Sequence, residues 1–174
     1  MEARLELRAG EDKGRMYRVV PEGKPGRPIA NLAAKNTRDL VAALDSANGW
    51  QRDTAMRLLF ERADRSAGES LNQLLSLTHA PQVRLQALAT LGMLGVLTPD
   101  TVMSALADPH PAVRCEALRQ SEALAGKSEA LFTAVATAAL DSDANVRLQA
   151  AFSLGAWPPG KIESVLRQLA ARED

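Results

Sequence analysis

Residues 108–120 read DPHPAVRCEALRQ and set a positive charge, Arg114, in the middle of an apolar helical pattern. Val113 comes one residue before the arginine, and Ala117 and Leu118 come three and four residues after it. At 100° per residue these positions form one apolar arc centred near the arginine, so the pattern predicts a helix with Arg114 on its inward side. Because a buried charge without a partner is costly, we expect a carboxylate nearby.

The same pattern occurs four times along the chain. The aligned segments are GWQRDTAMRLL (49–59), PQVRLQALATL (81–91), PAVRCEALRQS (111–121) and ANVRLQAAFSL (144–154), which superpose without gaps on Arg52, Arg84, Arg114 and Arg147. These four residues, here called the repeat arginines, are separated by 32, 30 and 33 residues. A period of this length is typical of stacked helical hairpins.

A first helix is expected before each of these second helices, at 37–46, 68–77, 99–108 and 129–140. Residues suited to helix ends support this: the Ser66 and Glu69 capping box, N-caps at Thr98, Ser128, Asn48 and Asp143, and glycines 95, 126 and 155 after second helices. Another first-type helix follows the break at 158–160. The sequence thus predicts an all-α array of about four and a half hairpins.

The N-terminal residues read differently. Residues 3–20 alternate apolar and polar side chains around AGEDKG, as a β-hairpin does, and PEGKPGRP (21–28) has the composition of a linker. We therefore expect a β-hairpin and linker over 1–25 and the helical array over 26–174.

Two aspartates are the expected partners of the inward charges. Asp108 and Asp141 lie six residues before Arg114 and Arg147, in the turns that lead into those helices. At this spacing a carboxylate can accept hydrogen bonds from the guanidinium and from free backbone N–H groups, and can link one hairpin or neighbouring hairpins. If Asp108 pairs with a buried Arg114, replacing it with Ala should cost about 3 kcal/mol.

The first two repeats have no acidic residue at this position. Arg52 has Asp45 or Asp53 as candidate partners, and Arg84 has no obvious one. The sequence therefore predicts an incomplete set of ion pairs.

The segment DSDANVRLQAAFSLG (141–155) resembles the HEAT repeat of α-solenoids. The shared pattern is an Asp, four or five residues, Val-Arg, two residues, Ala-Leu or Ala-Ala, and then Leu-Gly, and the resemblance covers residues 37–172. It implies a HEAT-like α-α superhelix, a small right-handed solenoid.

A narrower resemblance rests on GRMYRVVPEG (14–23), LVAALDSANGWQRDTAMRLLFER (40–62), LQALATLGML (85–94) and LADPHPAVRCEALR (106–119). These segments look like the middle of bacterial PVC-type haem-binding CxxCH proteins, also described as membrane-bound dehydrogenases. In that family a β-propeller precedes a HEAT array and a cytochrome c module follows it, so residues 3–20 would be the last hairpin of a propeller. This chain has no CxxCH motif and no propeller, so the family's haem and quinone chemistry does not carry over to it.

Composition and isolated reactive residues favour a non-catalytic protein. Lys and Arg number 21, as do Asp and Glu, so no basic field favours nucleic acid or anionic membranes, and no segment has the length and apolarity of a membrane span. His79 and His110 lack neighbouring ligands, and Cys115 aligns mostly with apolar residues. We therefore expect no catalytic, cofactor-binding or metal site.

The remaining candidate site is a stripe two, five and six residues beyond each repeat arginine, where stacked hairpins would present a partner-binding concave surface. It comprises Thr54, Arg57, Leu58, Gln86, Ala89, Thr90, Glu116, Arg119, Gln120, Gln149, Phe152 and Ser153, with Trp50 beside it. The alternative is a merely solvated face.

The function expected from these features is a non-catalytic HEAT-repeat interaction or spacer module. It would bind a protein or neighbouring domains of the same chain, as a segment of a multidomain haem-binding dehydrogenase-like protein. The alternative is a stand-alone HEAT-like enzyme or nucleic-acid-binding protein. The resemblance implies a periplasmic location, whereas a chain complete as written would be cytoplasmic.

Overall fold

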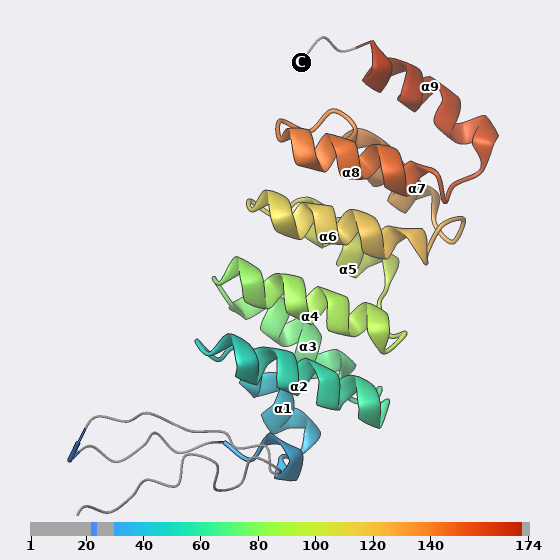
Figure 1. Ribbon diagram of the computed structural model, residues 1–174. Helices are drawn as coiled ribbons and strands as arrows, with labels where there is room; N and C mark the ends of the chain where they lie inside the picture. Colours follow the sequence, from blue (N-terminus) through green and yellow to red (C-terminus); the bar gives the residue numbers. More distant parts are fainter. Residues whose placement is uncertain (1–21, 24–29, 172–174) are drawn as a thin grey trace, which may run out of the picture. The chain divides into compact units, whose positions relative to one another are not determined.

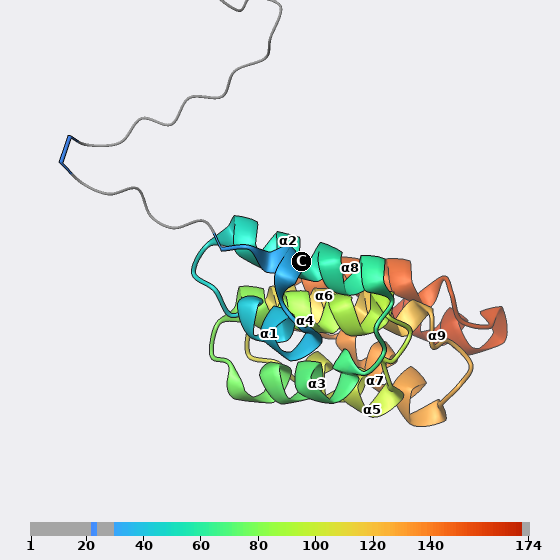
Figure 2. The same ribbon diagram turned by 90° about the horizontal axis from the view of Figure 1, so that it is seen from below.

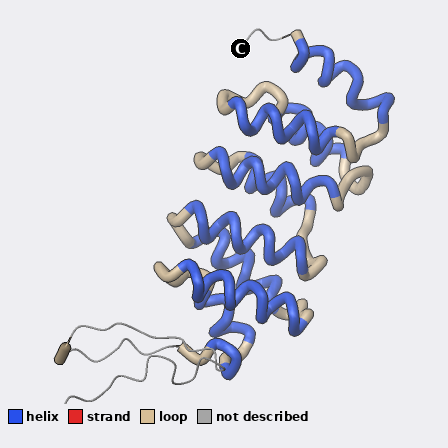
Figure 3. Tube along the Cα trace, in the orientation of Figure 1, coloured by secondary structure: helices blue, strands red, loops and turns tan. Residues whose placement is uncertain are grey.

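The computed structural model describes residues 22–23 and 30–171. Within these residues the chain is all-α, as predicted, with a short 3-10 helix, nine α-helices and no strand (Figures 1 and 3). The helices are η1 Leu32–Ala34, α1 Thr37–Ala43, α2 Gly49–Arg62, α3 Ala67–Leu77, α4 Pro81–Met93, α5 Pro99–Leu106, α6 Pro111–Glu122, α7 Glu129–Ala138, α8 Ala144–Leu154 and α9 Pro159–Ala170. The predicted β-hairpin, 3–20, lies outside the described residues. The chain divides into two compact units, Met1–Ala30 and Asn31–Asp174.

The helices of the second unit pair as the repeat predicts. α1 packs on α2, α3 on α4, α5 on α6 and α7 on α8, each pair forming a hairpin. The second helices of successive hairpins also pack on each other, so α2, α4, α6 and α8 form one layer and α1, α3, α5 and α7 form the other (Figures 1 and 2). α9 contacts α8 and has no second helix of its own among the described residues.

Local capping explains where most helices begin. Thr98, Ser128, Asn48 and Asp143 each accept a hydrogen bond from a backbone N–H in the first turn, as expected. The capping box predicted at Ser66 is wrong, because the Ser66 hydroxyl donates to Asp64 Oδ1 at 2.6 Å instead. Ser66 has helical backbone angles, φ of −66° and ψ of −15°, whereas a capping residue has an extended backbone that brings its oxygen to the N–H groups of the first turn.

Small and aliphatic residues build the core. One hydrophobic cluster extends from Leu88 in α4 to Trp157 after α8, and it includes Leu118 and Leu131, which are fully buried. The hydroxyl of the buried Thr90 donates to a carbonyl of its own helix, so it joins the apolar interior without an unsatisfied donor. The scarcity of aromatic side chains thus agrees with close packing between helices.

Candidate functional site

The repeat arginines occupy equivalent positions in the four hairpins. Nη1 of each donates to the backbone carbonyl six residues earlier, in the turn within its own hairpin. The acceptors are Ser46 for Arg52 (2.8 Å), Thr78 for Arg84 (3.3 Å), Asp108 for Arg114 (2.9 Å) and Asp141 for Arg147 (3.0 Å). This repeated bond holds the turn against the second helix and confirms that the arginines point inward.

The side-chain partners of Arg52, Arg84 and Arg114 come from the following hairpin. Asp108 accepts two hydrogen bonds from Arg84, at 2.7 and 2.9 Å, and Asp141 accepts two from Arg114, at 2.8 and 2.7 Å. The predicted pairing of Asp108 with Arg114 and of Asp141 with Arg147 is therefore wrong for the side chains. The carboxylate points back toward the preceding hairpin, and only the backbone carbonyl of the same residue reaches its own arginine.

The first two repeats also differ from expectation. Arg84, expected to lack a partner, has a bidentate one, since the partner belongs to the next turn. Arg52 donates from Nε to Gln86 Oε1 at 3.1 Å rather than to Asp45 or Asp53. Gln86 in turn donates to Asp53 at 2.7 Å, so a neutral amide takes the place of the carboxylate in the first link.

Electrostatics agree with this geometry. Partial burial by itself would raise the pKa of Asp108, but hydrogen bonds from Arg84 and from the backbone N–H of His110 outweigh it and hold the pKa below its usual value. The pKa of Asp141 is likewise lowered, with burial opposed by Arg114 and the Asp143 N–H. Both carboxylates are therefore charged at neutral pH.

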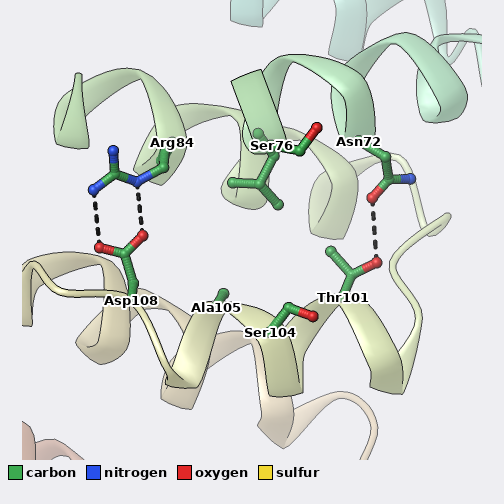
Figure 4. Close-up of a pocket in the computed structure, with 8 residues that line it drawn as sticks. Asn72, Ser76, Arg84, Thr101, Ser104, Ala105 and Asp108 are labelled. Atoms are coloured by element: carbon green, nitrogen blue, oxygen red, sulfur yellow. Dashed lines mark hydrogen bonds and ion pairs between the residues drawn. The ribbon is translucent and has the colours of Figure 1, made fainter. Parts of the chain in front are cut away.

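A cleft with polar groups at both ends separates two first helices. α3 and α5 make far fewer backbone contacts than α1 with α3 or α5 with α7, and a cavity of about 310 Å³ lies between them. The Arg84–Asp108 pair closes one end, and Thr101 donates to Asn72 at 3.2 Å at the other (Figure 4). The cleft is lined by Asn72, Leu75, Ser76, Arg84, Thr101, Ser104, Ala105 and Asp108. The sequence did not predict this cleft, because no residue pattern indicates that a cavity lies between two equivalent first helices.

The predicted partner-binding stripe does not form one exposed surface. Arg57, Arg119 and Phe152 are exposed and Thr54, Leu58, Gln86, Ala89, Gln120 and Gln149 are half-buried, but Thr90, Glu116 and Ser153 are buried. Much of the stripe instead lies in the seam between neighbouring second helices, where Ser153 donates to Glu122 at 2.7 Å. The interpretation as a continuous concave surface is wrong at these buried positions.

Exposed apolar residues on the second helices mark a different surface. Phe60 is 50% and Met93 40% exposed, and with Asp53, Met56 and Arg57 they line a hollow of about 350 Å³ between α2 and α4. We call these five residues the α2–α4 hollow. Trp50, at the start of α2, is 57% exposed. Phe60 and Met93 were missed because they lie eight and nine residues after their arginines, beyond the aligned segments.

The two histidines and the cysteine lie in surroundings typical of structural residues. His110 accepts the Ala112 N–H at Nδ1 and so caps α6, while His79 is exposed. Burial raises the pKa of the Cys115 thiol, which disfavours the thiolate that a nucleophile needs. Over residues 22–23 and 30–171, no group of three or more His, Cys, Asp or Glu side chains is placed to hold a metal ion. No helix in the same residues is long and apolar enough to cross a membrane.

Comparison with known proteins adds little. No family model matches the chain, and no curated protein matches it. A crystal structure of an engineered protein is similar with a TM-score of 0.44 and 19% sequence identity, over 75% of this chain and 67% of that chain. A likeness at this level carries no argument about function.

Proposed function

We propose that the chain is a non-catalytic HEAT-repeat α-solenoid that serves as a protein-interaction or spacer module. The observation that carries this proposal is the repeated link in which one guanidinium joins its own turn to the next hairpin. Such links resist changes in spacing between hairpins, as a scaffold requires. Stacked two-helix repeats of this kind offer extended surfaces to other proteins.

The α2–α4 hollow is the proposed contact surface. Exposed Phe60 and Met93 lie beside the charged Arg57, a combination of aromatic, thioether and guanidinium groups that is enriched in protein interfaces. A partner that inserts an apolar side chain there would remove both residues from water, and burial of that kind dominates the energy of interface hot spots.

The charges of the second-helix layer do not favour the nucleic-acid alternative. Arg57 pairs with Glu61 at 3.1 Å and Arg119 with Glu116 at 3.3 Å, so the two arginines of the stripe are already matched by carboxylates. A nucleic-acid surface needs an excess of positive charge. The matched charges therefore favour protein binding over nucleic-acid binding.

Within this function, we propose that the chain is the helical segment of a larger haem-binding dehydrogenase-like protein of the PVC type. Support comes from the sequence resemblance over 14–23, 40–62, 85–94 and 106–119. The reading frame that encodes the chain tests it directly. Propeller-encoding sequence upstream and a CxxCH motif downstream are expected, and a native start at Met1 with a stop after Asp174 would contradict it.

Site-directed photo-crosslinking tests the contact surface. A benzoylphenylalanine at position 60 should capture a defined polypeptide in extracts of the source organism, and Met93→Asp should abolish the capture. The same probe at Leu77, which is 75% exposed on α3, is the matched control. Mapping the cross-linked peptides shows whether the captured polypeptide is a second protein or residues 1–29 of the same chain. Equal capture from positions 60 and 77 would refute the proposed surface.

A further inference from the structure

Four exposed residues lie together on one face of α2. Trp50 and Phe60 are 57% and 50% exposed, and Asp53 and Arg57, which lie between them in the sequence, are exposed as well. Their spacing of three, four and three residues keeps them within about 80° of the helix circumference. We call Trp50, Asp53, Arg57 and Phe60 the α2 face.

The α2 face is not the end surface of the helical array. The end of the array at α2 is occupied by η1, which packs on α2 and which Arg62 holds by donating to the carbonyls of Ala33 and Lys35, at 2.8 and 2.7 Å. Arg62 lies about 140° around α2 from Arg57. The α2 face is therefore open for a reason other than the first residue of the array, and in the described part of the chain no helix covers it.

The α2 face is complementary to itself under two-fold symmetry. Trp50 and Phe60 lie five residues before and after Ala55, and Asp53 and Arg57 lie two residues before and after it. If two copies of α2 pair antiparallel and cross at the level of residue 55, Trp50 of each copy faces Phe60 of the other. In the same arrangement each Asp53 faces an Arg57, so one pattern supplies both sides of the interface.

The charges favour this register over its neighbours. Glu61, which pairs with Arg57 of its own helix at 3.1 Å, falls opposite the uncharged Gly49. Centring the crossing on Arg57 instead would oppose two arginines and set Asp53 against Glu61. Like charges placed opposite each other disfavour an interface, so the crossing at residue 55 is the better one.

The other second helices do not share this pattern. At the equivalent positions α4 has Gln82, Leu85, Ala89 and Gly92, which include neither a charge nor an aromatic ring. The self-complementary arrangement is therefore a property of α2 and does not follow from the repeat.

We propose that the α2 face binds a second copy of this chain, through two antiparallel α2 helices related by a two-fold axis. The inference rests on the proposed function, because Asp53, Arg57 and Phe60 also line the α2–α4 hollow, and it names the partner. The two contacts between Trp50 and Phe60 bury apolar surface, and the two pairs of Asp53 with Arg57 fix the register. Because one helix from each copy makes the contact, the dimer is weak and depends on concentration.

Reversing charges in separate chains tests the register. The Asp53→Arg chain has two basic residues on the α2 face and the Arg57→Asp chain has two acidic ones, so each chain alone should dimerise about tenfold more weakly than the unaltered chain. An equimolar mixture of the two should restore the association, because every facing pair is then opposite in sign. Sedimentation velocity of the full chains over a range of concentrations measures all three cases.

The aromatic contacts are tested with a matched control. Trp50→Ser should weaken dimerisation about tenfold, whereas Leu77→Ser, altered at a residue that is 75% exposed on α3, should leave it unchanged. Circular dichroism checks that both variants keep the helix content of the unaltered chain. In the purified chain, a benzoylphenylalanine at position 60 should cross-link to the peptide that contains Trp50 of the second copy.

Two results would overturn the proposal: a chain that stays monomeric up to about 1 mM, or a mixture of the two charge variants that does not associate. Capture of a different protein from extracts by the probe at position 60, together with a monomeric chain, would overturn dimerisation and leave the proposed interaction function standing. Equal capture from positions 60 and 77 by a monomeric chain would count against both.

Discussion

Three of the repeat arginines, Arg52, Arg84 and Arg114, each connect two hairpins through one side chain. In Arg114, Nη1 reaches the carbonyl of Asp108 in its own turn, while Nε and Nη2 reach the carboxylate of Asp141 in the next. The guanidinium is planar and has five donors, so it can satisfy both directions at once, which a lysine ammonium on its flexible stem cannot do with the same geometry.

Asp108→Ala should lower the free energy of unfolding by about 3 kcal/mol, because it leaves the largely buried Arg84 without its carboxylate. Urea denaturation measures the loss. Glu61→Ala, which breaks an exposed pair with Arg57, is the control and should cost about 0.5 kcal/mol or less.

A double-mutant cycle identifies the partner. Asp108→Ala should couple strongly with Arg84→Ala and add independently to Arg114→Ala, because the carboxylate contacts only the former guanidinium. Strong coupling to Arg114 instead would show that the pairing lies within one hairpin.

Acid should weaken both carboxylate links. Because the pKa values of Asp108 and Asp141 are lowered in the folded chain, their stabilisation is fully present above the unfolded pKa of about 3.9 and is lost as the pH falls through the folded pKa. The urea midpoint should therefore drop as the pH falls below about 4. The Asp108→Asn, Asp141→Asn double variant should show a shallower drop, and an unchanged slope would contradict this origin.

At the scale of the helices, backbone conformation at the helix ends sets local stability. α2 ends at Ala63 with φ of 49°, a left-handed conformation that is unfavourable for a residue with a Cβ, whereas α4 is followed by Gly95 with φ of 65°. Glycine adopts such angles without strain. Both helices are thus followed by a left-handed residue, which is alanine after α2 and glycine after α4.

Ala63→Gly should raise the free energy of unfolding by about 0.5 kcal/mol, because relief of the left-handed strain exceeds the added freedom of the unfolded chain. Gly95→Ala is the reverse change and should lower it by about 1 kcal/mol. Thermal and urea denaturation of both variants check the signs, and stabilisation by Gly95→Ala would contradict the assigned conformation.

The helices and the inward arginines could be predicted from the sequence, because a period of three to four residues and repeated capping signals are local. The stripe could not. A helical wheel treats one helix in isolation, whereas Ser153 is buried where α8 meets Glu122 of the neighbouring second helix. The partner of Arg84 was missed for the same reason, because it lies in the next hairpin and its position depends on how successive hairpins stack.

Over the whole helical unit, packing is uneven. The large core cluster runs from Leu88 to Trp157, and the buried leucines of α1–α3, such as Leu40 and Leu71, lie outside it. The cleft between α3 and α5 falls at the same boundary. The two sides are held mainly by the α4–α6 contact and by the Arg84–Asp108 pair.

Hydrogen exchange should therefore reveal two levels of protection. Amides of α1–α3 should exchange through a lower-energy opening than those of α5–α8, because few contacts cross the cleft. Native-state exchange in low urea, read by mass spectrometry, measures both. Asp108→Ala should lower the protection of the amides in α1–α3 more than that of the amides in α5–α8. A single common level of protection for all helices would contradict the division.

The α5–α6 hairpin carries both halves of the link, Arg114 for the hairpin after it and Asp108 for the one before. Such a repeat can be removed as a unit: excising residues 108–140 removes one acceptor and one arginine together and leaves Asp141 in the place of Asp108, next to Arg84. An array assembled this way can lengthen or shorten by gene duplication or deletion of whole repeats without any compensating substitution.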